Sequence, residues 1–251
     1  MKNEQLQHGL HHDNPCLDRL ENNDFPSWTF GTPARFTGSN MAALEKIAKY
    51  RSLDKGEHLY RMGDALRAIY VIRQGSIKSS LLCQDGRTQV VAFLVPGEIL
   101  GLDGICEGRH PSDATALETT DVCELPFGQL ERLARAVPSL HRYLLRQLSR
   151  EIDLGEKKLF LLGRLNAEAR VATFLLDLSQ RYGRANIPAK QLKLPMTRQD
   201  LGDHLGIALE TVSRVLSHFQ DKGLLQVQGR RINLLDLNRL QTKATAETGS
   251  L

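Results

Sequence analysis

The sequence of 251 residues contains no long apolar run and only four cysteines. A helix that spans a membrane needs about 20 mostly apolar residues in a row, so no membrane partner is expected. The first residues contain neither an apolar signal core nor a cleavage site, which predicts a cytoplasmic protein. The cysteines are too scattered for the disulfide framework of a small secreted domain; they are Cys16, Cys83, Cys106 and Cys123.

Motifs of the common enzyme classes are also missing. The sequence has no HExxH, no phosphate-cradling glycine loop and no recognisable pairing of a nucleophile with a base. A cupin-like metal site would require clustered His and Glu on strands, and no such clusters occur. We therefore expect that the protein is not an enzyme.

The stretch from Met196 to Gln220 is typical of two short helices joined by a tight turn. Thr197 is a good N-terminal capping residue, and Asp200, three positions on, forms a weak capping box with it. Gly206 tolerates the left-handed backbone conformation that ends a helix. The second helix has an apolar face at helical spacing, formed by Val212, Val215, Leu216 and Phe219.

The opposite face of this second helix carries side chains that can read DNA. Arg214 can donate two hydrogen bonds to guanine, Glu210 can accept one from cytosine, and Ser213 can bond a base edge or a phosphate. These residues lie in the first two turns, the part that faces base edges in a helix-turn-helix. The alternative is an ordinary amphipathic helix with a solvated polar face. Further candidate DNA contacts on this helix pair are Thr197, Arg198, Thr211 and Ser217.

Positive charge is concentrated in the same part of the chain. From Arg164 onward there are 13 Lys and Arg against 8 Asp and Glu, a net charge of +5, whereas the remainder holds 20 against 21, a net charge of −1. A basic domain suits a phosphate-rich partner. The segments 224–227 and 231–235 flank Gln228-Gly229-Arg230 as a short hairpin, a wing in which Arg230 or Arg231 can reach a phosphate.

Residues 39–128 form a separate unit with short runs of β-forming residues. Glycines recur there at intervals of twelve, eleven and eleven residues, which predicts an antiparallel β-roll or jelly roll; these are Gly63, Gly75, Gly86 and Gly97. Such a roll holds either a small ligand or a packed core. The segment Met41–Tyr50 has helical character and residues 1–38 are expected to form an irregular arm. The expected strands lie in the runs HLY, AIYVI, SIKSSLL, QVVAFLV, EILG and VCELPF.

Residues 129–163 are expected to form one long helix. Apolar residues recur along it at alternating steps of four and three, as in a coiled coil, which predicts a parallel homodimer. The alternative is that this stripe packs against the β-roll alone, although Leu144 and Leu161 make it wide enough for both contacts. The residues expected at the dimer interface are Leu145, Leu148, Ile152, Gly155 and Leu159. Residues 164–242 then form the winged helix-turn-helix domain, and residues 243–251 a flexible tail.

This arrangement resembles the CRP/FNR superfamily of bacterial transcription regulators, and within it the FNR/FixK branch. The resemblance implies an α+β protein with an N-terminal β-roll of the cyclic-nucleotide-binding type, a long dimerisation helix and a C-terminal winged helix-turn-helix. It also implies a palindromic DNA target similar to TTGAT-N4-ATCAA, read by Glu210, Ser213 and Arg214 of each subunit. Ala208 departs from the family, which often has a capping Thr there. The similarity is carried by GDALRAIYVIRQGSIKS, GLDGI…HPSDATALETTDVCELPF, LLGRLNAEARVATFL and MTRQDLGDHLGIALETVSR.

The cofactor of the family is not expected here in its usual form. FNR-type members hold an iron–sulfur cluster with three N-terminal cysteines spaced CxxCxxxxxC and one in the β-roll. Cys123 matches the internal ligand, but the arm offers only Cys16, whereas a cluster normally takes four thiolates. A redox pair formed by Cys16 and Cys123 is an alternative. Cyclic AMP is not expected either, because Leu102 and Pro111-Ser112 replace the Glu and the Arg-Ser pair that hold it.

The resemblance also implies a contact with RNA polymerase through the loop Asp85-Gly86-Arg87, for which a plain hairpin is the alternative. We expect an activator in an oxygen- or redox-related network, with the signal unknown and dimerisation either constitutive or regulated. A haem- or nitric-oxide-responsive regulator of the denitrification type is the first alternative, with His58 or His110 as haem ligand. The others are a β-roll protein that binds a small molecule, and an interaction adaptor without specific DNA binding.

Overall fold

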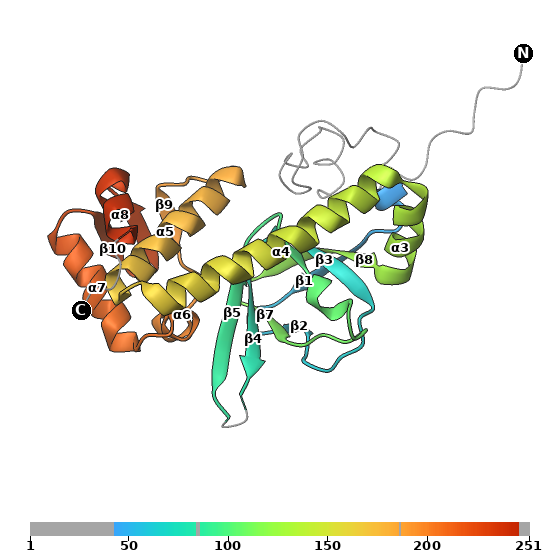
Figure 1. The fold of residues 1–251 in the computed structure, drawn as a ribbon, viewed down its shortest axis with the longest axis horizontal. Coiled ribbons are helices and arrows are strands. Elements are labelled where there is room, and N and C mark those ends of the chain that lie inside the picture. The colour runs from blue at the N-terminus through green and yellow to red at the C-terminus, as the bar shows by residue number, and fades with distance from the viewer. Residues whose placement is uncertain (1–42, 84–85, 186, 246–251) are drawn as a thin grey trace, which may run out of the picture.

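The computed structural model describes residues 43–245 except residues 84, 85 and 186. A β-roll lies along one long helix, and a small helical domain lies at the C-terminal end of that helix and against the roll (Figure 1). This is the predicted α+β architecture. In the described residues no helix is both long and apolar enough to cross a membrane.

The β-roll consists of two four-stranded sheets in which adjacent strands pair antiparallel. One sheet has the order β1-β8-β3-β6 and the other the order β2-β7-β4-β5. Buried apolar side chains such as Ile72, Ile77 and Val122 fill the space between them. The strands are β1 (Lys49–Leu53), β2 (His58–Tyr60), β3 (Ala68–Gln74), β4 (Ile77–Leu82), β5 (Thr88–Leu94), β6 (Ile99–Leu100), β7 (Asp113–Ala116) and β8 (Thr120–Pro126).

Each of the six predicted runs contains a strand, and two strands were not predicted. These are β1 and β7. The predicted helical segment Met41–Tyr50 is partly wrong, because residues 43–45 are helical but Tyr50 lies in β1 and pairs with Cys123. At one of the recurring glycines the need for glycine is steric. Gly75 has φ 83°, and a Cβ there would lie 2.4 Å from the carbonyl oxygen of Thr119.

The predicted single helix over residues 129–163 is in fact two helices, α3 (Phe127–Ala136) and α4 (Pro138–Arg164). Val137 between them has an extended backbone (φ −121°, ψ 95°), and Pro138 is the first residue of α4. Proline disfavours the helical conformation in the residue before it and lacks the N–H that a continuing helix would bond. The break therefore follows from Pro138, and α4 alone, with 27 residues, is the long helix.

The C-terminal domain is a winged helix-turn-helix with one more strand and one more helix than predicted. Its helices are α5 (Ala167–Arg184), α6 (Arg198–Leu205), α7 (Leu209–Asp221) and α8 (Leu237–Ala244), and its three-stranded sheet has the order β10-β11-β9. The strands are β9 (Gln191–Lys193), β10 (Leu225–Gln228) and β11 (Arg231–Leu234). The unpredicted elements are β9 and α8, and α8 extends into the segment that was expected to be a tail from residue 243.

The two domains share one hydrophobic core. Val90 and Phe93 of the β-roll belong to the same buried cluster as Phe174 of α5 and Leu201 of α6. The helix-turn-helix is therefore packed directly on β5, and its orientation relative to the β-roll is set by side-chain packing as well as by α4.

Candidate nucleic-acid interface

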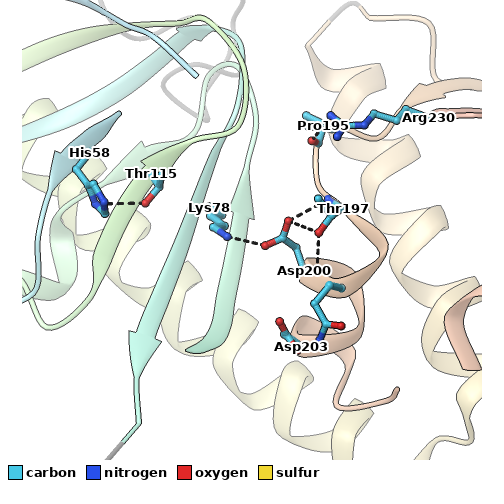
Figure 2. A network of polar contacts seen from close by, with 9 residues as sticks. His58, Lys78, Thr115, Pro195, Thr197, Asp200, Asp203 and Arg230 are labelled. Carbon is cyan, nitrogen blue, oxygen red and sulfur yellow. Dashed lines mark hydrogen bonds and ion pairs between the residues drawn. The ribbon is translucent and has the colours of Figure 1, made fainter. Parts of the chain in front are cut away.

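The first helix of the motif begins with a complete capping box. The Thr197 hydroxyl accepts a hydrogen bond from the Asp200 N–H at 3.0 Å, and Asp200 Oδ2 accepts one from the Thr197 N–H at 3.0 Å. The weak box expected from the sequence is thus fully formed, and Figure 2 shows both side chains turned toward each other. At the other end of α6, Gly206 adopts the predicted left-handed conformation (φ 63°, ψ 40°). These two features fix where α6 starts and stops.

The second helix, α7, presents the predicted polar face to solvent. Glu210, Ser213, Arg214 and Ser217 are exposed, and Thr211 is half-buried and accepts a hydrogen bond from Arg214 Nη2 at 3.4 Å. The apolar face is buried as predicted; it consists of Val212, Val215, Leu216 and Phe219. Ala208 caps α7 without a side-chain hydrogen bond, which matches the expectation drawn from its departure from the family pattern. The face can therefore approach a duplex without any rearrangement within α7.

Two of the arginines predicted to contact DNA also form hydrogen bonds that connect α6 and the wing. Arg230 Nη1 donates to the Pro195 carbonyl at 3.1 Å (Figure 2), and Arg198 Nη2 donates to the Gly229 carbonyl at 3.4 Å. Burial lowers the pKa of Arg198 from its ordinary value. Each guanidinium has five N–H donors, so these bonds leave donors for a phosphate.

Contacts between α6 and the β-roll form a polar network that the sequence did not predict. Lys78 Nζ on β4 donates to Asp200 Oδ1 at 2.5 Å (Figure 2), and Gln89 Nε2 donates to the Asp203 carbonyl. Burial alone would raise the pKa of Asp200, but the hydrogen bonds from Lys78 and Thr197 outweigh it and hold that pKa below its usual value. Asp200, which completes the capping box of α6, therefore also forms an ion pair with the β-roll.

A second group of contacts lies where α4, β5 and α6 meet. The ring of His204 lies 5.0 Å from that of Phe93 and 5.7 Å from that of Phe174, centroid to centroid. Its Nδ1 lies 3.2 Å from the Val90 carbonyl and 3.3 Å from Lys158 Nζ. Burial lowers the pKa of Lys158 to about 8, and burial together with Lys158 lowers that of His204 to about 3. These two basic groups are thus parts of the interdomain packing.

The predicted dimer stripe on α4 is largely exposed in the single chain. Leu145 is 52 % exposed, Ile152 66 % and Leu159 74 %, while Leu148 is half-buried against the β-roll. No atom lies within 4 Å of the Cβ position of Gly155. Leu144 and Leu161, which widen the stripe, are packed against buried clusters of the β-roll and of the C-terminal domain, respectively. The alternative in which the stripe packs on the β-roll alone is wrong.

The loop with the predicted polymerase contact connects β4 and β5. Asp85 lies outside the described residues, and Gly86 and Arg87 are exposed. The Cys83 N–H donates to the Arg87 carbonyl at 2.8 Å, and Gly86 has φ 81°. β4 and β5 form a ribbon that extends away from the rest of the β-roll (Figure 1), and Gly86 and Arg87 lie near its end.

Comparison with known proteins finds the same two domains and identifies relatives that match most of the chain. Residues 169–243 match the Crp-like helix-turn-helix domain, and residues 50–136 match the cyclic nucleotide-binding domain. The transcriptional activator protein Anr of Pseudomonas protegens is 42 % identical over 205 residues, which are 81 % of this chain and 84 % of that one. The anaerobic regulatory protein of Haemophilus influenzae is 42 % identical over 194 residues, 77 % of this chain and 76 % of that one.

The structure of FixK2 from Bradyrhizobium japonicum superimposes with a TM-score of 0.73 at 35 % identity, covering 80 % of this chain and 98 % of that one. The chain belongs to the CRP/FNR superfamily. It is therefore a DNA-binding transcription regulator of this family, and the resemblance seen in the sequence is confirmed.

The cysteines among the described residues do not match the ligand set of the iron–sulfur cluster in FNR-type members. Cys123 is buried among apolar side chains on β8, whereas Cys83 and Cys106 are exposed, and Cys16 lies outside the described residues. No group of three His, Cys, Asp or Glu residues suited to a metal ion occurs in residues 43–245 as described. Four thiolates converging on Cys123 are not available from this set.

The residues that the resemblance matches to the cyclic-nucleotide site of CRP-type members lie inside the β-roll. Leu102 is buried, and the Ser112 hydroxyl shares a 3.0 Å hydrogen bond with Ser79. The candidate haem ligand His110 is only 2 % exposed and stacks on Tyr60 at 3.6 Å between ring centroids. The other candidate, His58, has its Nδ1 3.4 Å from Thr115 Oγ1. Leu102, His110 and Ser112 are therefore buried within the β-roll, whereas His58 is half-buried.

Proposed function

We propose that the protein acts as a homodimer on a palindromic DNA site similar to TTGAT-N4-ATCAA. The exposed face of α7 supports this most directly, because Glu210, Ser213 and Arg214 stand together on the first turns of a helix whose other face is buried. A pair of such helices, one from each subunit, reads two half-sites about one DNA turn apart. Thr197 and Arg198 at the start of α6 and Arg230 in the wing provide further contacts to the DNA.

The dimer forms through α4 of each subunit. Its exposed stripe has the coiled-coil spacing, and a contiguous row of exposed large apolar side chains marks an interaction surface. Leu145, Ile152 and Leu159 provide the central contacts. Gly155 allows the two helices to approach closely at that level, because it carries no side chain.

The protein activates transcription in an oxygen- or redox-related network. Relatives bear the names transcriptional activator and anaerobic regulatory protein, and these names support an equivalent role here. The exposed hairpin tip at Gly86 and Arg87 provides a surface for RNA polymerase. The regulator works without a conventional four-iron cluster and without cyclic AMP, because the required Cys and Arg residues are missing from the sequence.

Substitution of Arg214 tests the proposal. Arg214→Ala removes a bidentate contact with guanine and should weaken binding to the palindrome by about 1–3 kcal/mol, with a much smaller effect on a scrambled duplex of equal length. Lys222→Ala removes the same charge at the end of the same helix and serves as the control, with a small, sequence-independent loss. Fluorescence anisotropy at fixed salt measures both.

The outcomes separate the parts of the proposal. An equal loss on both duplexes would make Arg214 a phosphate contact and leave base reading to other residues. A wild-type protein that binds the palindrome no better than the scrambled duplex would refute the proposed target.

A further inference from the structure

A single side chain, Arg170 in the first turn of α5, connects the ends of two other helices. Its Nη2 donates to the Leu162 carbonyl at 2.8 Å and its Nε to the Leu165 carbonyl at 2.9 Å, both at the end of α4. Its Nη1 donates to the Leu205 carbonyl at 3.0 Å and lies 3.4 Å from the Gly206 carbonyl, both at the end of α6. One guanidinium therefore serves the C-terminal ends of the dimer helix and of the first helix of the DNA-binding motif.

The chemistry of helix ends explains why an arginine stands here. The last carbonyls of a helix have no intrahelical partner and carry the negative end of the helix dipole, so a cation is favoured at that point. Here two such ends converge on one cation. Arginine satisfies them with a flat fork of several donors in fixed directions, whereas the ammonium of lysine is a point charge without this geometry.

The surroundings make this contact a rigid joint. The Leu162 side chain of α4 lies 3.4 Å from the Cβ position of Gly206, so α4 also packs against the turn of the motif. The start of α5 is held by Asn166, whose side chain accepts a hydrogen bond from the Ala169 N–H at 2.9 Å. Consequently α4, α5 and the turn before α7 cannot change their mutual angles without breaking bonds to Arg170.

We propose that Arg170 is a positioning residue for DNA recognition: it fixes the angle between α4 and the helix-turn-helix, and so the spacing of the two α7 helices in the dimer. This inference rests on the proposed homodimer and palindrome. Arg170 touches no base in this role. Its donors are directed at backbone carbonyls, and it acts on DNA only through the orientation of α6 and α7.

The role predicts an effect that depends on how many half-sites the DNA offers. When a dimer binds a palindrome, the second half-site is engaged intramolecularly, and this advantage is lost if the two recognition helices are not held at the right spacing. Arg170→Gln should therefore weaken binding to the N4 palindrome by about tenfold or more, and binding to a duplex with one half-site by less than about threefold. It should also reduce the preference for N4 over sites with spacers of three, five or six base pairs.

The matched control is Arg239→Gln. Arg239 lies in the same domain and has one bond to a helix end, from its Nη1 to the Lys222 carbonyl at 3.3 Å, so the substitution removes the same charge. Arg170→Lys tests geometry against charge; it should resemble Arg170→Gln more than the wild type. Amide hydrogen exchange without DNA gives a second measurement. Two amide protons report on the joint: the Ile207 N–H, which donates to the Gly202 carbonyl, and the Leu165 N–H, which donates to the Leu161 carbonyl. Both should exchange faster in Arg170→Gln than in Arg239→Gln.

A loss confined to the palindrome together with faster exchange at the joint supports the role. Equal losses on both duplexes, or palindrome binding equal to that of Arg239→Gln, would overturn it. A wild-type protein without a preference for the palindrome would refute the proposed function instead. The hydrogen-exchange comparison would then test the role of Arg170 separately. Unchanged exchange of the Leu165 and Ile207 amides would refute the proposal that Arg170 holds α4 and α6 together.

Discussion

Removal of the Ile152 side chain is the sharpest test of the dimer helix. Ile152 lies in the middle of the exposed stripe on α4 and is 66 % exposed in the single chain. In the proposed dimer it lies against its counterpart on the partner helix. Ile152→Ala keeps the helix, because alanine is the best helix former, and removes only the apolar atoms that the partner would cover.

The size of the effect follows from the exposed fraction. Complete burial of an isoleucine side chain is worth about 1.5–3 kcal/mol, and about two thirds of this side chain remains to be buried by the partner. Alanine retains a small part of that area, so each subunit loses about 1–1.5 kcal/mol and the symmetric dimer about 2–3 kcal/mol. At about 1.4 kcal/mol per factor of ten, the dissociation constant of the dimer should rise about 30- to 150-fold.

Sedimentation equilibrium over a range of concentrations, without DNA, measures this constant. The control is Leu154→Ala on the same helix. Leu154 is also exposed, at 42 %, but two residues on it lies roughly 200° around the helix axis from Ile152. The control should change the dissociation constant by less than about threefold, because its side chain points away from the stripe. Equal weakening by both substitutions, or by neither, would refute the assignment of the stripe.

Two further predictions concern α6 and its packing. The pKa of His204 is held at about 3 in the folded protein, against about 6.5 when unfolded, so the unfolded state binds more protons between these values and stability falls as the pH drops through that window. At pH 5.5 the loss from His204 should be about 1.4 kcal/mol in urea unfolding, and a His204→Gln variant with the same pH dependence would contradict this. A Cβ at Gly202 would lie 2.6 Å from the Ile207 carbonyl oxygen, so Gly202→Ala should destabilise the domain by about 1–3 kcal/mol. Gly128→Ala on α3, where nothing lies within 4 Å, should instead stabilise by about 0.5–1 kcal/mol, and thermal unfolding of both variants checks the difference in sign.

The elements that the sequence predicted well are those with strong local patterns. The six runs of β-forming residues and the apolar face of α7 are dictated by side-chain periodicity and by glycine at turns. The two missed strands lack such patterns. In β1 the first four residues are exposed and only Leu53 is buried, and β7 reads DATA, in which threonine is the only residue that favours strands. Both strands exist because a neighbouring strand supplies the pairing.

The sequence contained signals for the helix boundaries that were predicted wrongly, but the prediction followed the helical periodicity instead. The helical pattern after Pro126 suggested one helix over residues 129–163, although Pro138 is a helix-start signal. The helix α8 was missed because its sequence LNRLQTKA is mostly polar and only Leu240 is buried. Its N-cap, Asp236, which accepts a hydrogen bond from the Arg239 N–H, was the available signal.

In the candidate site, too, the local features could be predicted from the sequence and the long-range contacts could not. Exposure of Glu210, Ser213 and Arg214 is a property of one amphipathic helix and could be predicted from its sequence alone. The contacts that orient this helix join residues 35 to 122 positions apart, from Arg170 with Leu205 to Lys78 with Asp200, and no local pattern announces them. A lysine on a strand and an arginine on a helix read as ordinary surface residues until the fold brings their partners close.

These long-range contacts fall on the two ends of α6, and that placement has a mechanical consequence. The N-terminal end is bound to the β-roll by the ion pair of Asp200 with Lys78, and the C-terminal end is bound to the dimer helix through Arg170. The exposed face of α7 takes part in neither contact and stays open to DNA. Because α7 packs on α6 through a buried core and follows it after a turn of three residues, a shift of either the β-roll or α4 changes the pose of the recognition face by tilting α6. A displacement of the β-roll relative to α4 would therefore tilt α6, while Glu210, Ser213 and Arg214 keep their positions on α7.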